Sequence, residues 1–158
     1  MPLLETLVLL LVALVALIEG KRGFGRGLFD LAGAILTVKL SRTLAFALAP
    51  NVHLFASGTG NEAALLVAFA AVLGTAFVFA ARFLYDITLI SLDAFDSVFG
   101  LFLGLASGVA VAHILLLAML MGSVPAKRPQ IKQTRVFREC VNFESYHSFI
   151  NFLETAGR

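Results

Sequence analysis

The sequence predicts an all-α membrane protein with four transmembrane helices, arranged as two antiparallel hairpins, and a C-terminal amphipathic helix on the membrane surface. Composition is the first reason: 59% of residues are hydrophobic and only 14% are charged, against roughly 25% charged in soluble domains. Acidic and basic residues are also absent from 6–18, 63–81 and 97–126. The alternative is a soluble helical protein with an exceptional core, which we do not expect because a chain of 158 residues is too short to bury such runs.

Four stretches are candidate membrane spans, because about 20 helical residues at about 1.5 Å each cross about 30 Å of hydrocarbon. They are 3–18, 28–48, 63–84 and 97–121. The first is short, and Glu5 stands where the basic region of a cleaved signal peptide belongs, so we expect it to remain as an anchor. The spans define a transmembrane domain, residues 1–122, followed by a basic and amphipathic tail, residues 123–158.

The fourth span carries small residues at every fourth position, which leaves one face of the helix without bulky side chains. This glycine face consists of Gly100, Gly104, Gly108 and Ala112. Helices in lipid associate through close van der Waals contact, which such spacing permits. The third span has Ala70 and Gly74 at the same spacing, and we predict that it packs against the glycine face.

Residues 19–27 contain four glycines and are predicted to form a tight loop. The first two spans then form an antiparallel hairpin that places Glu5 level with Arg42 and one turn from Lys39. A charge near mid-membrane costs about 3 kcal/mol on insertion scales, so we predict an ion pair there. The alternative is that Lys39 and Arg42 extend to the membrane interface without pairing.

Opposite charges gather at one membrane side, where the first loop meets the connection between the third and fourth spans. The predicted charge cluster contains Arg22, Arg26, Asp30, Arg82, Asp86, Asp93 and Asp96. We expect it to hold the two hairpins together, with Asp93 or Asp96 also capping the fourth helix. Two alternatives remain: the charges are solvated separately and contribute about 0 to 1 kcal/mol, or they gate a charged solute.

The tail begins with prolines and a run of cations. The basic residues are Lys127, Arg128, Lys132, Arg135 and Arg138. Each is attracted to anionic headgroups by about 1 kcal/mol, so we expect this segment to lie on the lipid surface. Phe143, Tyr146, Ile150 and Leu153 then share one helical face, which predicts an interfacial amphipathic helix. The alternative is a tail helix docked on the protein's own loops.

The distribution of Lys and Arg predicts orientation, because such residues favour the cytoplasmic side. Four lie on the side of the first loop: Lys21, Arg22, Arg26 and Arg82. Seven lie on the other side, namely Lys39, Arg42 and the five basic residues of the tail. We therefore expect both termini in the cytoplasm, although the first loop alone favours the reverse.

The sequence contains no motif for enzyme chemistry: no phosphate-binding glycine loop, zinc-binding helix, paired cysteines or serine elbow. We therefore expect no catalytic site and no cofactor. Cys140, Glu144 and His147 share a helical face but leave a metal site incomplete, and the basic residues lack the aromatic platform of nucleic-acid binders. His113 faces away from the glycine face and is expected to hydrogen-bond a neighbouring helix, with a proton relay as the alternative.

Several of these features occur in an order that resembles the colicin V production protein family. They are Glu5, the run Arg22-Gly23-Phe24 with Arg26, and the ladder Asp96-xxx-Gly100-xxx-Gly104-xxx-Gly108. The resemblance covers residues 1 to about 121. The chain departs from the family pattern in having Glu5 for an aspartate, and serines at 97 and 107 where arginine is common.

The resemblance implies a four-span protein of the bacterial inner membrane that is linked with peptide-toxin production and envelope homeostasis. Our leading hypothesis is a non-enzymatic factor that works through membrane or envelope protein partners, with a homo-oligomer as one form. The rival is a small transporter or channel for an ion or small solute. In that case Glu5, Lys39, Arg42 and the aspartates of the charge cluster line the solute route.

Overall fold

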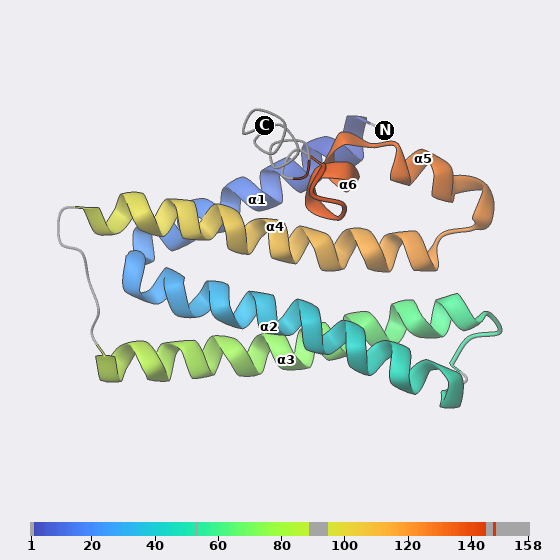
Figure 1. Ribbon diagram of the computed structural model, residues 1–158, viewed down its shortest axis with the longest axis horizontal. Helices are drawn as coiled ribbons and strands as arrows, with labels where there is room; N and C mark the ends of the chain where they lie inside the picture. Colours follow the sequence, from blue (N-terminus) through green and yellow to red (C-terminus); the bar gives the residue numbers. More distant parts are fainter. Residues whose placement is uncertain (1, 53, 89–94, 145–146, 148–158) are drawn as a thin grey trace, which may run out of the picture.

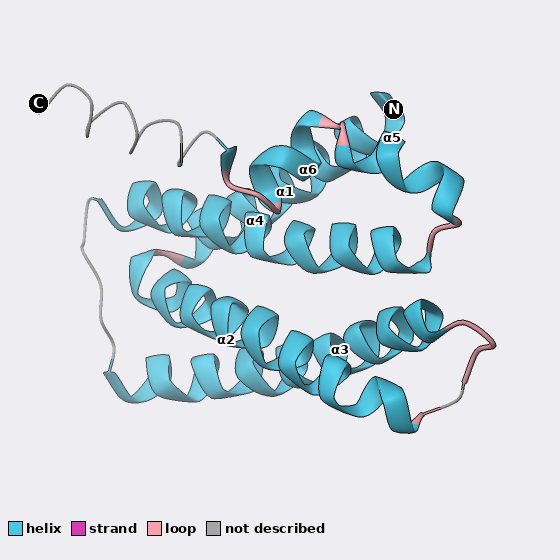
Figure 2. Ribbon diagram, turned by 45° about the vertical axis from the view of Figure 1, so that its right-hand side comes forward, coloured by secondary structure: helices cyan, strands magenta, loops and turns pink. Residues whose placement is uncertain are grey.

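Four long helices make up most of the computed structural model, which describes residues 2–52, 54–88, 95–144 and 147 (Figure 1). They are α1 (Pro2–Arg22), α2 (Phe24–Leu48), α3 (Gly58–Thr88) and α4 (Asp96–Gly122). Each is long and apolar enough to cross a membrane, which confirms the number of predicted spans. Within the described ranges the chain forms only helices and loops (Figure 2).

Short helical elements complete the structure. They are η1 (Ala49–Asn51), η3 (Pro125–Lys127), α5 (Arg128–Lys132) and α6 (Arg135–Cys140). The turn between α1 and α2 lies at the same end of the molecule as the end of α3 and the start of α4 (Figure 1). The loop between α2 and α3 lies at the opposite end, where α4 also ends.

The helices pair differently from the predicted hairpins. α1 packs chiefly on α4, and α2 packs chiefly on α3, whereas α1 and α2 share few contacts. Figure 1 shows α1 and α2 diverging from the turn that joins them. The predicted antiparallel hairpin of the first two spans is therefore not confirmed as a packing unit, because the close contact available at the glycine face draws α1 onto α4.

The turn between α1 and α2 is a single residue, Gly23, so the predicted loop over residues 19–27 is also wrong. Gly23 has φ 89° and ψ 174°, a conformation open to glycine but strained for other residues. Helical hydrogen bonds continue on both sides, since Gly23 N donates to Glu19 O at 2.9 Å and Gly27 N donates to Gly23 O at 3.0 Å.

The glycine face of α4 lies directly against the backbone of α1. A methyl group on Gly104 would lie 2.7 Å from Ala16 Cα, and one on Gly108 would lie 2.9 Å from Val12 Cα. The partner of this face is thus α1, and the predicted packing of Ala70 and Gly74 against it is wrong. Gly74 instead faces α2, where an added methyl would lie 3.7 Å from Thr37 Cγ2.

The first part of the tail, helices α5 and α6, docks on the protein. A core cluster joins side chains of α5 and α6 to α1 and α4: Val8, Ala112, Leu116, Ile131, Val136, Phe137 and Cys140. This docking of α5 and α6 was not predicted from the sequence, and contact of the basic residues with lipid headgroups stays a prediction. The predicted amphipathic face lies largely outside the described residues, since Tyr146, Ile150 and Leu153 are not among them.

The basic residues of the tail divide into two groups. Those on the outer surface are Lys127, Lys132, Arg135 and Arg138. Arg128 is instead partly buried and donates to the carbonyl oxygens of Ser123 at 3.2 Å and Met121 at 3.4 Å, and to Thr59 Oγ1 at 3.2 Å. A cation at this position satisfies carbonyl groups at the C-terminal end of α4 and suits its dipole.

Two polar contacts hold the tail in place. Glu5 Oε1 accepts a hydrogen bond from Arg135 N at 2.9 Å, which caps the first turn of α6. His113 Nδ1 lies 2.9 Å from the carbonyl oxygen of Cys140, so the buried imidazole joins α4 to α6. The predicted ion pair of Glu5 with Lys39 or Arg42 is absent from the part of the chain that the structure describes.

Lys39 and Arg42 are exposed on the outer surface of α2. Arg42 lies over the ring of Phe46, 5.7 Å from its centroid, a cation–π geometry. Glu5 instead accepts a hydrogen bond from the tail, and the alternative in which the two cations extend to the membrane interface stays a prediction.

Maleimide labelling of Cys140, the single cysteine of the chain, tests whether the tail is docked. It is buried, and burial, followed by the charge of Glu139, raises the pKa of its thiol. Because maleimide reacts with the thiolate, we expect labelling in mild detergent to be at least about tenfold slower than in unfolding detergent. The labelling rate of the unfolded chain should level off near pH 8.5, because the ordinary pKa of a cysteine thiol is about 8.5. The labelling rate of the native protein should continue to rise above that pH.

Phe137→Ala provides the matched variant for this labelling experiment, because Phe137 is buried in the same cluster as Cys140. Loosening the tail should raise the labelling rate toward that of the unfolded chain. Equal rates for the wild-type protein in the two detergents would show that the tail is not docked.

Candidate functional site

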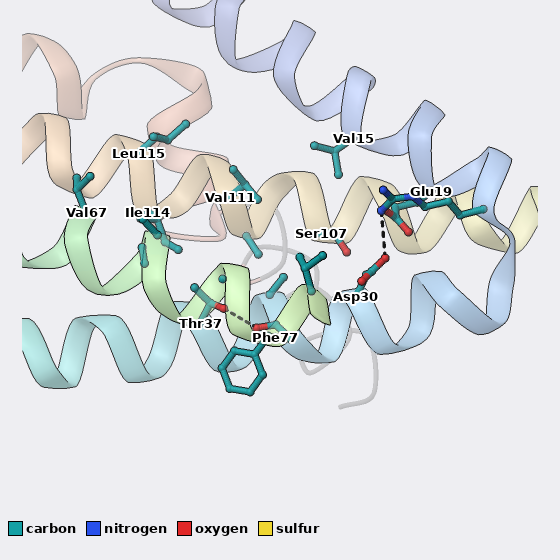
Figure 3. Close-up of a pocket in the computed structure, with 18 residues that line it drawn as sticks. Val15, Glu19, Asp30, Thr37, Val67, Phe77, Ser107, Val111, Ile114 and Leu115 are labelled. Atoms are coloured by element: carbon teal, nitrogen blue, oxygen red, sulfur yellow. Dashed lines mark hydrogen bonds and ion pairs between the residues drawn. The ribbon is translucent and has the colours of Figure 1, made fainter. Parts of the chain in front are cut away.

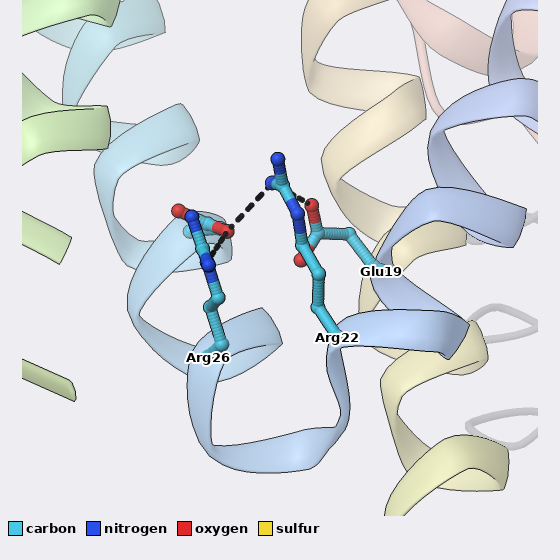
Figure 4. A network of polar contacts seen from close by, with 4 residues as sticks. Glu19, Arg22 and Arg26 are labelled. Atoms are coloured by element: carbon cyan, nitrogen blue, oxygen red, sulfur yellow. Dashed lines mark hydrogen bonds and ion pairs between the residues drawn. The ribbon is translucent and has the colours of Figure 1, made fainter. Parts of the chain in front are cut away.

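Four charged side chains form an ion-pair cluster where α1 turns into α2 (Figure 4). Arg22 Nη1 lies 2.9 Å from Glu19 Oε1 and 3.4 Å from Asp30 Oδ2. Arg26 Nε lies 3.8 Å from the same oxygen of Asp30. Arg22 therefore bridges a carboxylate of α1 to a carboxylate of α2, across the two helices that otherwise share few contacts.

The carboxylates of this cluster are buried and the guanidinium groups reach outward. The side chains of Glu19 and Asp30 are 5% and 10% exposed, whereas those of Arg22 and Arg26 are 36% and 25% exposed. A buried carboxylate is costly without a partner. Because two positive and two negative charges balance, the cluster as a whole is compatible with its place at the end of membrane-spanning helices.

Glu19 is the member of the ion-pair cluster that the sequence prediction missed. The predicted loop placed it outside a helix, yet it lies in α1 three residues before Arg22. Acidic and basic side chains at this spacing meet on one helical face. The spacing of Glu19 and Arg22 therefore predicts their ion pair, but only if both residues are assigned to a helix rather than to a loop.

Asp96 caps a helix, although not the helix predicted. Its Oδ1 accepts a hydrogen bond from Phe24 N at 3.0 Å, at the N-terminal end of α2, where a carboxylate also suits the helix dipole. The N-cap position of α4 is Phe95, with no side-chain hydrogen bond. The contact connects the two halves of the molecule as predicted for the charge cluster, but through a backbone amide.

The remaining members of the predicted charge cluster do not join the ion-pair cluster. Arg82 and Asp86 are exposed near the end of α3, and neither forms an ion pair with another described residue. Asp93 lies outside the described residues. The predicted pairing of loop cations with aspartates of the second hairpin is therefore corrected: Arg22 and Arg26 pair with Glu19 and Asp30.

A cavity of about 420 Å³ lies between the α1–α4 pair and the α2–α3 pair (Figure 3). It exists because α1 leaves α2 after the turn and packs on α4. All four helices contribute to its lining, which is largely apolar and includes Val15, Ala70, Gly74, Phe77 and Val111. A volume of this size falls within the range of about 300–1,000 Å³ for small-molecule sites.

The polar groups of the cavity are concentrated at one end, next to the turn. Glu19, Arg22 and Asp30 line that end, and Figure 3 shows the hydroxyl group of Ser107 beside them. Thr37 is the other polar lining residue, and its hydroxyl group donates to Gly33 O at 2.8 Å. The cavity thus has a charged end and an apolar body.

Glu5, Lys39 and Arg42 do not line this cavity. The predicted solute route along these residues is therefore corrected. The described ranges also contain no group of three His, Cys, Asp or Glu side chains placed to hold a metal ion. Within the segment considered as an incomplete metal site, Glu144 pairs with Arg138 at 3.3 Å.

One known protein family matches most of the chain that forms this arrangement. The family model described as Colicin V production protein matches residues 4–145. The match includes the four long helices, the ion-pair cluster, and the docked helices α5 and α6. No curated protein and no solved structure matches the chain. The chain belongs to the colicin V production protein family.

Proposed function

We propose that this protein is a non-enzymatic factor of the bacterial inner membrane that supports peptide-toxin production or export, or envelope homeostasis, through protein partners. Membership of the colicin V production protein family supports the link with toxin production. The observation that favours a partner-binding role over conduction is the ion-pair cluster, in which the charges of α1 and α2 neutralise one another.

The rival function is transport of an ion or small charged solute. A route for such a solute needs polar groups along its length, within a water-filled path. The charged lining residues Glu19, Arg22 and Asp30 occupy one end of the cavity, and the rest of its lining is largely apolar. This distribution favours the partner-binding role.

Two measurements separate these functions. In a bacterial strain that lacks the gene, we expect secretion of a peptide toxin to fall and the wild-type gene to restore it. Liposomes that contain the purified protein are expected to pass ions and small solutes no faster than empty liposomes. A flux that is present with the wild-type protein and lost in Asp30→Asn, which alters a carboxylate that lines the cavity, would instead establish transport.

We further propose that both termini lie in the cytoplasm, as the excess of Lys and Arg on the tail side favours. The docked tail supports a common side for the two ends, since Glu5 near the start of the chain contacts Arg135. A fluorescent protein fused to the C-terminus, which matures only in the cytoplasm, tests this orientation. Activity of alkaline phosphatase fused at the same point would contradict it.

A further inference from the structure

We propose that the cavity between the two helix pairs binds a primary aliphatic amine, with the ammonium group at the ion-pair cluster and the chain along the apolar lining. The inference rests on the cavity alone and does not depend on the proposed function. Its basis is the set of atoms at the charged end of the cavity that have no hydrogen-bond partner.

Three hydrogen-bond acceptors are buried without a partner among the described residues: Glu19 Oε2, Asp30 Oδ1 and Ser107 Oγ. All three residues line the cavity. The side chain of Glu19 is 5% exposed and that of Asp30 is 10% exposed, so bulk water does not satisfy them. Buried polar atoms in folded proteins are almost always hydrogen-bonded, and these atoms therefore indicate a ligand that donates.

The chemistry of the three acceptors selects a primary ammonium group. Such a group offers three N–H donors and no acceptor, which matches two carboxylate oxygens and one hydroxyl group. Arg22 Nη1 already contacts both Glu19 and Asp30, while each carboxylate keeps one oxygen free of it. An anionic head would face these carboxylate oxygens and is disfavoured.

A fourth buried atom, Arg26 Nε, also lacks a hydrogen-bond partner among the described residues, at 3.8 Å from Asp30 Oδ2. Arg26 does not line the cavity. Its guanidinium group therefore balances the charge of Asp30 from outside the cavity, and Arg22 is the cation that lines the charged end beside the three acceptors.

The apolar body of the cavity accommodates an aliphatic chain. Its walls include small residues that leave space between the helices, among them Gly33, Ala71, Gly74 and Ala110. Val111 and Leu115 continue the apolar lining along α4, away from the charged end (Figure 3). A chain in this space gains van der Waals contact with these side chains, the interaction on which packing within lipid relies.

The test uses the full chain in phosphatidylcholine nanodiscs and four probes with the same ten-carbon chain: decylamine, decanol, decanoate and decyltrimethylammonium. Native mass spectrometry measures the bound fraction of each, with empty nanodiscs as the background. We expect decylamine to bind at least about tenfold more tightly than the other three, because only it donates charge-assisted hydrogen bonds to all three acceptors. Equal binding of the four probes would overturn the proposal.

Variants locate the binding site. Glu19→Gln should weaken decylamine about tenfold by removing the charge of one acceptor, and Ala110→Phe should exclude all four probes by filling the cavity. Asp86→Asn, which alters an exposed carboxylate of α3, is the matched control and should bind as the wild type does. The melting temperature of each variant shows whether it is folded, and unchanged decylamine binding in a folded Glu19→Gln would contradict the proposal.

The same amine chemistry can come from a free amine or from an aminolipid of the bilayer. Nanodiscs with phosphatidylethanolamine in place of part of the phosphatidylcholine distinguish the sources. Loss of decylamine binding there supports an aminolipid as the occupant, and retention supports a free aliphatic amine.

Discussion

Gly104→Ala is expected to disrupt the contact between α1 and α4 through the addition of one methyl group. The new carbon would lie 2.7 Å from Ala16 Cα and 2.7 Å from Glu19 Cβ, with Ala16 O at 3.1 Å. Overpacking of a filled core costs about 1–3 kcal/mol. We expect the upper part of this range, because the obstruction is helix backbone rather than the end of a flexible side chain. The free energy of unfolding in mixed micelles measures the effect.

Gly74→Ala is the matched control, since it adds the same methyl group to another membrane-spanning helix. That carbon would meet Thr37 Cγ2 at 3.7 Å, which is ordinary van der Waals contact. The change should leave stability within about 0.5 kcal/mol, or raise it slightly because alanine favours helix more than glycine does. Similar stability of the two variants would contradict the assigned role of the glycine face.

The spans and the glycine face were predictable because their signals are local in the sequence. Uncharged runs mark helices that lipid can solvate, and small residues every fourth position mark a face that permits close approach. Neither signal identifies the partner. Both α3 and α1 carry one small pair with the spacing of the α4 ladder, Ala70 and Gly74 in α3 and Ala16 and Gly20 in α1. It is α1 that approaches Gly104 and Gly108, with Ala16 and Val12.

The ion-pair cluster was predictable only in part. Arg26 and Asp30 are four residues apart, a local spacing at which opposite charges meet on one helical face, as they do in this ion pair. The contact of Arg22 with Asp30 depends on the sharpness of the turn. Four glycines within nine residues suggested a loop. In the structure only Gly23 adopts a turn conformation, with φ 89°, and Gly25 and Gly27 are buried in α2.

The tail shows why composition can mislead. Its five cations directed the prediction to the lipid surface and left unpredicted that Val136, Phe137 and Cys140 share one face of α6 and are buried. Positions at i, i+1 and i+4 are a usual sign of a docked helical face. The partners of the tail could not be predicted, because Glu5 and His113 reach it from positions 130 and 27 residues away along the chain.

Gly23→Ala is expected to destabilise the protein in two ways. The residue has φ 89°, and a side chain in such a conformation costs about 1–3 kcal/mol. The added methyl group would also overlap the carboxylate of Asp96 and displace it from Phe24 N. Loss of a helix cap typically costs a further amount of about 1 kcal/mol, within a range of about 0.5–2 kcal/mol. Gly58→Ala, where the methyl group meets nothing within 4 Å, is the control for the general effect of alanine.

The steric and conformational parts of this effect can be separated with Asp96→Ala. In that background the methyl group on Gly23 no longer meets a carboxylate, and the cap of α2 is already lost, so only the backbone strain should remain. The penalty of Gly23→Ala should therefore be smaller in Asp96→Ala than in the wild type, with a coupling of about 0.5–3 kcal/mol, the range for residues in contact. Equal penalties in the two backgrounds would show that Asp96 does not occupy the space beside Gly23. The α1–α2 turn would then be determined without a contribution from Asp96.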